Sequence, residues 1–330
     1  MMRHLKTLVA GLAATVALLF LNGCAHGNDH RSVPRRITFA VGTDIHKDIM
    51  HDADQRLQAF VDAAARAKVD FIVDLGDFCQ PKQANQGFLG IWNSFNGPRY
   101  RVLGNHDMDG GFTRAQAVAF MGMPARHYSF DVGGCHFVVL DGNDPDVPPR
   151  RGYPSWIGTE QLEWLKADLQ QTKSPTVLFS HQGLESSLRN GAEVRTALEI
   201  INRSAGWTKV VAAFSGHDHL DRHACINGIH YVTVNSMSNQ WLGEKYAHIR
   251  YRKEIDARFP YLKYTAPYRD PLFALVTIEP RKLTIKGVTS QWVGPSPKDL
   301  KLPESLANGP DKTGIAPQIS SRRLTIQERR

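Results

Sequence analysis

The sequence is poor in the features that would classify a protein by composition alone. It has four cysteines among 330 residues, and the three that follow Cys24 are too few and too widely spaced for a disulfide framework. A single bridge among Cys79, Cys135 and Cys225 stays possible. Internal repeats and low-complexity tracts are absent. The net charge is only +8, which suits an anionic substrate or surface but is far from a nucleic-acid-binding signature, so no nucleic acid partner is expected.

Long hydrophobic runs are also scarce, and the one at 8–21 is about as long as a signal-peptide core and too short for a comfortable membrane span. It ends in Leu-Asn-Gly-Cys at Cys24, which resembles the lipobox of bacterial lipoproteins. We therefore predict a lipoprotein-type signal peptide at 1–23 and a tether at 24–35. The mature protein would be exported to the periplasm or cell surface and anchored in the membrane only through a lipid on Cys24. Plain secretory cleavage nearby is the alternative.

The rest of the chain has the composition of a soluble globular domain, with 42% hydrophobic and 22% charged residues. We place one domain at 36–295 and a polar, proline-rich C-terminal tail at 296–330, which is either disordered or a strap across the domain. Strands and helices alternate early and hairpins follow, which predicts an α/β fold with mixed sheets. Helices are expected at 53–68, 86–95, 113–121, 158–169 and 191–202, and hairpin turns at Gly133-Gly134 and Asn227-Gly228.

Five apolar runs each end in carboxylate, imidazole or amide side chains. These residues are Asp44 and His46, Asp77, Asn105 with His106 and Asp107, His181, and His217 with His219. Because ligand-binding groups of open α/β sheets lie at the carboxyl ends of strands, we expect them to converge. Nitrogen and oxygen donors without a thiol favour Mn, Fe, Zn or Co. The potential ligands number seven: Asp44, His46, Asp77, Asn105, His181, His217 and His219. Seven ligands exceed one four-coordinate site, so the set predicts two divalent metal ions, an arrangement suited to displacement at phosphorus.

The motifs Asp-x-His, Gly-Asp, Gly-Asn-His-Asp, a single His and Gly-His-x-His, in this order across 36–290, resemble the calcineurin-like metallophosphoesterase superfamily. The pattern is closest to its cyclic-nucleotide phosphodiesterase and nucleotide-diphosphatase-like branch. The resemblance implies a four-layer α/β/β/α sandwich with two mixed sheets and metals at strand ends. It also implies residue roles: Asp44, His46 and His219 hold one metal, Asn105, His181 and His217 hold the other, and Asp77 bridges them. By the same resemblance His106 assists the leaving group, and Asp107 orients the His106 imidazole.

These inferences predict a metal-dependent phosphoric ester hydrolase. The expected substrate is an anionic phosphate ester, in first place a phosphodiester, attacked by a metal-bridged hydroxide with His106 assisting departure. A phosphomonoesterase is the alternative within enzymes, and a non-catalytic metal-binding scaffold is the alternative outside them. The segment 236–271 is rich in basic and aromatic residues. Since arginine binds phosphate in a bidentate manner, we predict that Arg250, Arg252 and Arg258 contact the substrate.

Overall fold

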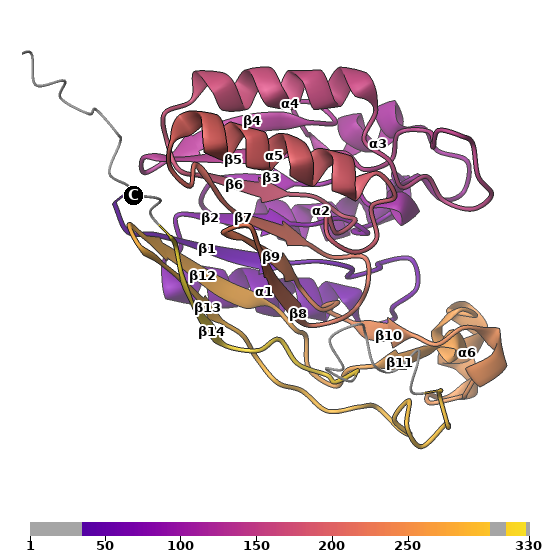
Figure 1. The fold of residues 1–330 in the computed structure, drawn as a ribbon. Helices are drawn as coiled ribbons and strands as arrows, with labels where there is room; N and C mark the ends of the chain where they lie inside the picture. The colour runs from indigo at the N-terminus through magenta and orange to yellow at the C-terminus, as the bar shows by residue number, and fades with distance from the viewer. Residues whose placement is uncertain (1–34, 304–314, 328–330) are drawn as a thin grey trace, which may run out of the picture. The chain divides into compact units, whose positions relative to one another are not determined.

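The computed structural model describes residues 35–303 and 315–327, and its first large sheet mixes parallel and antiparallel strands (Figure 1). The strand order is β14-β13-β12-β1-β2-β3. Neighbours β1, β2 and β3 run parallel, whereas β12, β13 and β14 join antiparallel. The strands are β1 (Ile37–Gly42), β2 (Phe71–Asp74), β3 (Arg99–Arg101), β12 (Ala274–Glu279), β13 (Lys282–Lys286) and β14 (Arg322–Thr325).

The second large sheet has the order β4-β5-β6-β7-β9-β8, with parallel strands at its centre and an antiparallel strand at each edge. Its strands are β4 (Tyr128–Val132), β5 (Cys135–Val139), β6 (Thr176–Phe179), β7 (Val210–Ser215), β8 (Arg222–Ile226) and β9 (Ile229–Thr233). Both predicted hairpin turns are present. Gly133-Gly134 and Asn227-Gly228 have positive φ at both residues, as the tight turns that match strand twist require.

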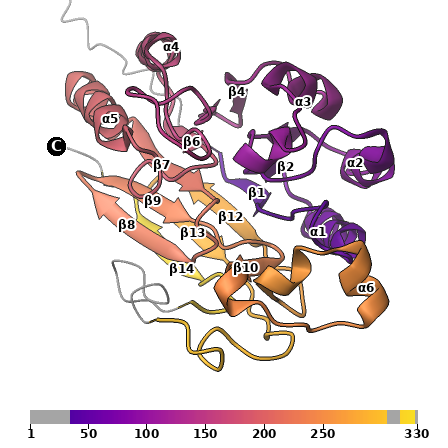
Figure 2. The ribbon, with the colours of Figure 1, turned by 90° about the vertical axis from the view of Figure 1, so that its right-hand side faces the viewer.

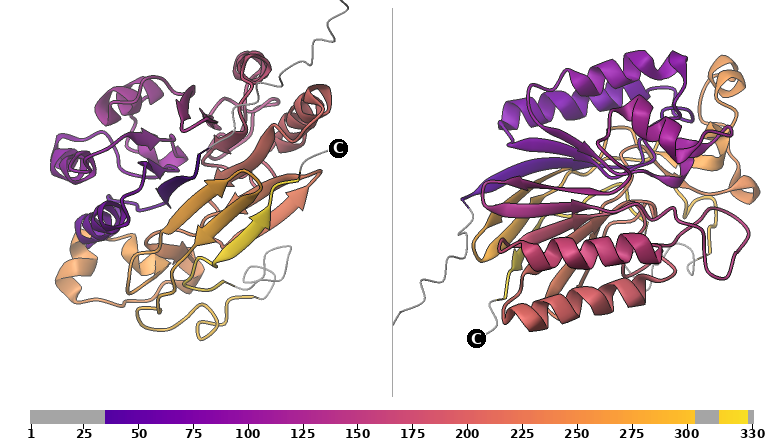
Figure 3. Two further views of the ribbon diagram at one scale, coloured as in Figure 1. Left: turned by 90° about the vertical axis from the view of Figure 1, so that its left-hand side faces the viewer. Right: turned by 90° about the horizontal axis from the view of Figure 1, so that it is seen from above.

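Helices cover the outer face of each sheet (Figures 2 and 3). Helices α1 (Ala53–Ala67), α2 (Gln86–Asn93) and α3 (Arg114–Met121) pack on the first sheet, for example through Leu57 and Phe60 against Ile72. Helices α4 (Thr159–Gln171) and α5 (Gly191–Ala205) pack on the second sheet. The four-layer α/β/β/α sandwich and all five predicted helices are therefore confirmed.

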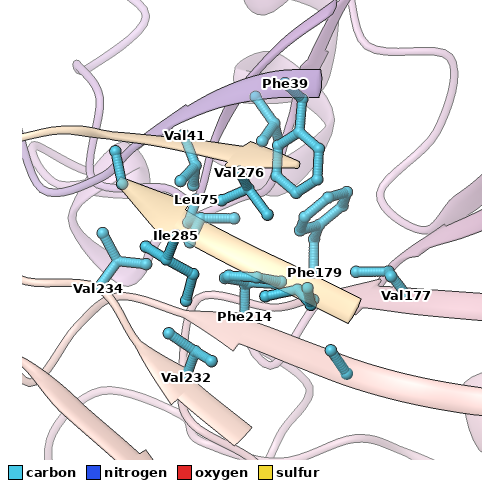
Figure 4. Close-up of a cluster of buried hydrophobic side chains, with 14 of the residues drawn as sticks. Phe39, Val41, Leu75, Val177, Phe179, Phe214, Val232, Val234, Val276 and Ile285 are labelled. Carbon is cyan, nitrogen blue, oxygen red and sulfur yellow. The ribbon is translucent and has the colours of Figure 1, made fainter. Parts of the chain in front are cut away.

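The central core lies between the two sheets (Figure 4). Phe39 of β1 stacks on Phe71 of β2 with ring centroids 4.9 Å apart, and meets Phe179 of β6 and Phe214 of β7 edge-on at 5.6 and 5.8 Å. Aromatic pairs in these geometries add to the stability gained from burial. This packing fixes β1 and β2 against β6 and β7, which are four of the five strands that carry the polar motifs.

The segment between β9 and β12 extends beyond the sheets. It contains β10 (Asn239–Trp241), α6 (Lys253–Arg258) and β11 (Thr265–Pro267), and β10 pairs with β11. Short 3₁₀ helices complete the secondary structure of the described residues: η1 (Gln83–Asn85), η2 (Asn105–Met108), η3 (Glu244–Tyr246) and η4 (Leu262–Tyr264). None of the described helices is long and apolar enough to cross a membrane. Cys79, Cys135 and Cys225 are free thiols.

The C-terminal residues 315–327 are part of the domain, so the expected domain end at 295 is wrong for this segment. Strand β14 pairs with β13 of the first sheet. Arg322 donates to Asp221, the residue before β8 of the second sheet, and the backbone carbonyl of Thr325 accepts a hydrogen bond from His230 of β9. The segment thus ties the two sheets together, as the strap alternative proposed. Its four-residue strand has a single buried side chain, Leu324, which is too weak a pattern to predict. The predicted signal peptide, Cys24 and most of the tether lie outside the described residues.

Candidate active site

The polar motifs occupy tight turns at strand ends, and these turns have an unusual backbone. A left-handed conformation, with φ between 51° and 65°, is found at Asp44, His46, Asp77, His217 and His219. Non-glycine residues seldom adopt this conformation, because it costs a conformational free energy of order 1–3 kcal/mol per residue. Neighbouring turns are joined by backbone hydrogen bonds from the Asp44 and His46 N–H groups to the carbonyls of Gly76 and Asp77. The strained backbone at these five residues therefore directs their side chains toward one place.

Two glycines of the motifs are required by close packing of the turns. A Cβ atom on Gly104 would lie 2.0 Å from the backbone nitrogen of Asp77, and one on Gly216 would lie 1.9 Å from the Thr43 hydroxyl oxygen. Both distances are far below van der Waals contact. The absence of a side chain at these positions lets the turns carrying Asp77 and His217 approach their neighbours.

The first cluster joins both sheets. Asp44 and His46 follow β1, His219 follows β7, and all three side chains are buried. The Nε2 atom of His219 lies 3.1 Å from Nε2 of His46 and 3.2 Å from Oδ1 of Asp44. The three potential ligand atoms lie within 4.8 Å of one another.

A second cluster lies beside it. Asp77 follows β2, His181 follows β6 and His217 follows β7, again with the ligand atoms within 4.8 Å of one another. The Nε2 atom of His181 lies 3.2 Å from Oδ2 of Asp77 and 3.2 Å from Nδ1 of His217. Asn105 in η2 completes the group, with its Oδ1 atom 3.1 Å from the same His181 nitrogen. The structure thus brings together all seven residues expected to bind metal.

The Asp77 carboxylate faces both clusters. Its Oδ2 atom lies 3.2 Å from Nε2 of His181 and 3.9 Å from Nε2 of His46. Its other oxygen accepts a hydrogen bond from the backbone N–H of His106 at 2.8 Å. Asp77 is therefore the carboxylate placed to bridge two cations.

The potential ligand atoms of the two clusters are better satisfied by metal ions than by hydrogen bonds among themselves. The buried Oδ1 atom of Asp44 has no hydrogen-bond partner. His181 and His219 direct Nδ1 to backbone carbonyl oxygens, at 2.9 Å to Leu75 and 2.7 Å to Asn239. That contact places a proton on Nδ1 and leaves the Nε2 lone pair directed into the cluster, as in metal-binding histidines. A buried convergence of lone pairs without a donor is costly, so these residues suit a pair of divalent cations.

The pKa values show how strongly the site demands positive charge. Burial alone raises the pKa of Asp77, yet the neighbouring imidazoles, His181 above all, hold it well below its usual range. Burial lowers the pKa of His46 to about 4, which keeps that ring neutral. Burial acts in the same direction on His181, but Asp77 overrides it and raises the pKa to about 10. Without metal a proton therefore takes the place of a cation, and metal binding releases it.

His106 reaches the same cavity but its partner is not the one expected. The prediction that Asp107 orients the His106 imidazole is wrong. Asp107 is fully buried and its carboxylate accepts backbone N–H groups of Phe78, Cys79 and Gly104, so it joins two turns. Asp109 instead lies 2.7 Å from Nδ1 of His106.

Tyr153 was missed by sequence reasoning as well. Its hydroxyl donates to Asp109 at 2.8 Å and lies 3.2 Å from Nδ1 of His106. The position of Asp109 three residues after His106, in the same turn, is a signal that sequence analysis could have used. Tyr153 gives no such signal, because it belongs to a loop 47 residues further along the chain.

A cavity of about 800 Å³ opens beside the two clusters. Its lining includes His46, Asp77, His106, His217 and His219, together with polar and aromatic residues of the surrounding loops and of the segment between β9 and β12. Those residues are Asp48, Gln80, Lys82, Asp109, Tyr153, Asp218, Gln240, Trp241 and Tyr261.

The arginines predicted to bind phosphate do not line this cavity. Arg250 donates to the backbone carbonyls of His248 and Pro295, while Arg252 and Arg258 are exposed on and beside α6. The expectation rested on the basic composition of 236–271, and composition does not say which side of an insert faces the site. The lysine of the cavity is Lys82, from the loop after β2.

The geometry predicts that replacing Asp77 removes metal. Wild-type protein loaded with Mn or Zn and then freed of excess ion should hold two ions per chain by mass spectrometry of its metal content. Asp77→Ala should lose one or both, because the carboxylate between the clusters is gone. Asp48→Ala, which changes a cavity carboxylate outside both clusters, should keep both. Full occupancy in Asp77→Ala would refute the bridging role.

Comparisons with known proteins agree with this geometry. The model of the calcineurin-like phosphoesterase family matches residues 37–221. A manganese-dependent ADP-ribose/CDP-alcohol diphosphatase from Oryza sativa subsp. japonica is 26% identical over 223 residues, covering 51% of this chain and 68% of the relative.

Two solved structures share the fold. A dimetal phosphatase from Danio rerio matches with a TM-score of 0.56 and 15% identity, over 78% of this chain and 98% of that one. GAP50, the anchor in the inner membrane complex of Plasmodium, matches with a TM-score of 0.52 and 18% identity, over 89% of this chain and 90% of that one. The family model spans more than half of the chain and includes every motif described above. The protein therefore belongs to the calcineurin-like phosphoesterase family and is a metal-dependent phosphoester hydrolase that uses two metal ions.

Proposed function

We propose that this enzyme hydrolyses phosphodiesters, as an exported protein anchored through a lipid on Cys24. The observation that carries the choice of diester is the charge of the cavity. Outside the two metal clusters, the described residues that line it include three aspartates, Asp48, Asp109 and Asp218, and one lysine, Lys82. Lys82 is already paired with Asp48 at 3.1 Å. A phosphomonoester carries close to two negative charges at neutral pH, whereas a diester carries one, so the surrounding carboxylates favour the diester.

The space around the clusters supports the same choice. At about 800 Å³ the cavity has the size of sites that enclose whole small-molecule ligands. A second groove, lined by Glu185, Ser186, Arg222 and His223, shares Asp218 with it. A large cavity with an adjoining groove suits a phosphate with two ester substituents better than a phosphate with one. The rice relative, named as a diphosphatase, acts by its name on a phosphate that is also substituted twice.

The residues divide the chemistry among them. Asp44, His46 and His219 would hold one metal ion, Asn105, His181 and His217 the other, with Asp77 between them. When bound, the ions supply Lewis-acid activation of the phosphoryl oxygen and of the attacking water.

We assign His106 to the leaving oxygen. Its ring lies 5.4 Å from that of His46, centroid to centroid, and it lines the cavity without belonging to either cluster. Asp109 and the Tyr153 hydroxyl both contact its Nδ1 atom, which leaves Nε2 as the nitrogen available to the substrate. A carboxylate on Nδ1 stabilises the imidazolium form, and this is the form that donates a proton to a departing alkoxide.

The export proposal rests on the leader and Cys24 alone. The basic start, the short apolar run and the Gly23-Cys24 pair are the pattern of a lipid-modified bacterial leader.

Hydrolysis of bis(p-nitrophenyl) phosphate beside p-nitrophenyl phosphate tests the diester proposal. With Mn, Zn, Fe or Co restored to stripped protein, we expect the diester to be cleaved with the higher kcat/KM. His106→Ala should lower kcat by about 10²–10⁴-fold, the range of general acid–base groups, and keep its metal. Faster cleavage of the monoester would favour the phosphomonoesterase, and an unchanged kcat would remove His106 from the mechanism.

The two neighbouring carboxylates should give opposite phenotypes. Asp109→Asn should lower kcat about 10-fold, and more for a methyl ester than for a p-nitrophenyl ester, because a poor leaving group depends most on the proton from His106. Asp107→Asn should instead lower the free energy of unfolding by about 1–3 kcal/mol, since its carboxylate accepts three backbone N–H groups. Steady-state kinetics and urea unfolding measure the two effects. Equal losses for both esters in Asp109→Asn would contradict its role.

Mass spectrometry of the mature N-terminus tests the anchor. Expressed in a bacterium, the protein should begin at a lipid-modified Cys24 and fractionate with membranes, and Cys24→Ala should release it. Cys225→Ala, which changes an exposed cysteine of the domain, should stay with the membrane. An unmodified N-terminus at another residue would end the lipoprotein proposal.

A further inference from the structure

Exposed aromatic side chains are concentrated at the catalytic cavity. Among the described residues, the exposed large hydrophobic side chains are Val147, Tyr153, Ile200, Trp241, Ile249 and Tyr261. The three aromatic ones all line the same cavity, and the three aliphatic ones do not. Scattered exposed apolar residues need no explanation, but aromatic residues gathered around one concave site indicate a ligand.

Trp241 and Tyr261 both lie beside Tyr264. Trp241 pairs with Thr265 across β10 and β11, next to Tyr264. The ring of Tyr264 lies 6.1 Å from that of Trp241 and 6.2 Å from that of Tyr261, centroid to centroid. Backbone N–H groups of Leu242 and Gly243 both donate to the Tyr264 carbonyl. Trp241 is 46% exposed and Tyr261 is 57% exposed, so each ring is braced on one side and open on the other.

Tyr153 belongs to the same cavity lining as Trp241 and contacts the catalytic residue His106. Its ring lies 4.6 Å from that of His106, and its hydroxyl is fixed by Asp109. Tyr153 and Tyr261 line the same cavity. Aromatic surface therefore extends from the leaving-group side of the site to the insert between β9 and β12.

We propose that Trp241 and Tyr261, with Tyr153 beside them, bind a planar aromatic group carried by the phosphodiester, of the size and chemistry of a nucleobase. The proposal rests on the proposed function, because it names what one ester substituent carries. Aromatic faces stack on any base without reading its edges, and Gln240 and Lys82 supply polar contacts nearby. The mixed polar and aromatic lining also distinguishes this region from an apolar surface for lipid.

A matched pair of diesters tests the proposal. Adenosine 5′-(methyl phosphate) and 1-O-methylribose 5-(methyl phosphate) share the sugar and the reacting group and differ in the base. We expect wild-type enzyme to show a KM about 10-fold lower for the compound with the base. Trp241→Ala and Tyr261→Ala should each raise that KM about 10-fold without lowering kcat, and should leave the KM of the compound without a base unchanged. Trp241→Phe should restore most of the loss.

Ile249→Ala is the matched control, because it changes an exposed hydrophobic residue of the same insert outside the cavity. Equal effects of Trp241→Ala on both diesters, or equal KM values for both in wild type, would overturn the proposal while the diesterase function stands. If neither diester is hydrolysed, the proposed function fails, and saturation-transfer NMR with adenosine decides the inference alone. Transfer to the base that Trp241→Ala abolishes would support it, and no transfer in wild type would overturn it.

Discussion

The burial of negative charge at the carboxyl ends of β1 and β2 is the constraint on which the rest of the site depends. Asp44 and Asp77 are almost fully excluded from water. Buried carboxylates are stable only when positive charge or hydrogen-bond donors surround them. The second sheet supplies imidazoles rather than lysines or arginines, so the positive charge has to come from protons or from metal ions. Without metal, Asp77 raises the pKa of His181 despite its burial, so that a proton on this ring supplies the positive charge. The family match indicates that metal ions supply it in the active enzyme.

This constraint also explains the architecture around the site. The carboxylates come mainly from the first sheet and the imidazoles His181, His217 and His219 from the second, so neither sheet forms the clusters alone. The aromatic core between the sheets sets the distance between these two groups (Figure 4). Left-handed backbone at five of the seven residues is tolerated because the turns are fixed by hydrogen bonds to one another and by the buried Asp107. Asp107 thus serves catalysis through the shape of two turns, without contact with the His106 ring.

The sequence predicted most of what depends on local pattern. Helices with a clear apolar period, hairpins at Gly133-Gly134 and Asn227-Gly228, and the seven polar residues at strand ends are all local signals. It failed where the decisive contact is distant or depends on orientation. Tyr153 contacts His106 from a loop distant in the sequence, and β14 is too short to give a recognisable strand pattern. Whether Asp107 or Asp109 contacts His106 depends on how the backbone directs each carboxylate within η2 and just after it. Whether the arginines of the insert reach the cavity depends on which side of the insert faces solvent.

Apart from β14, these failures concern the segments around the cavity. The groups that carry the chemistry lie on strand ends, which the sheets hold in a fixed order, and family motifs record that order. Further groups that line the cavity lie on the loop after β2, the loop before α4 and the insert between β9 and β12. Loops of this kind generally tolerate changes in length and composition without disturbing the sheets that they connect. Lys82, Tyr153 and Trp241 each come from a different one of these loops. The sheets of this protein therefore position the residues that suit two metal ions, whereas much of the cavity beside those residues is formed by loops and by the insert.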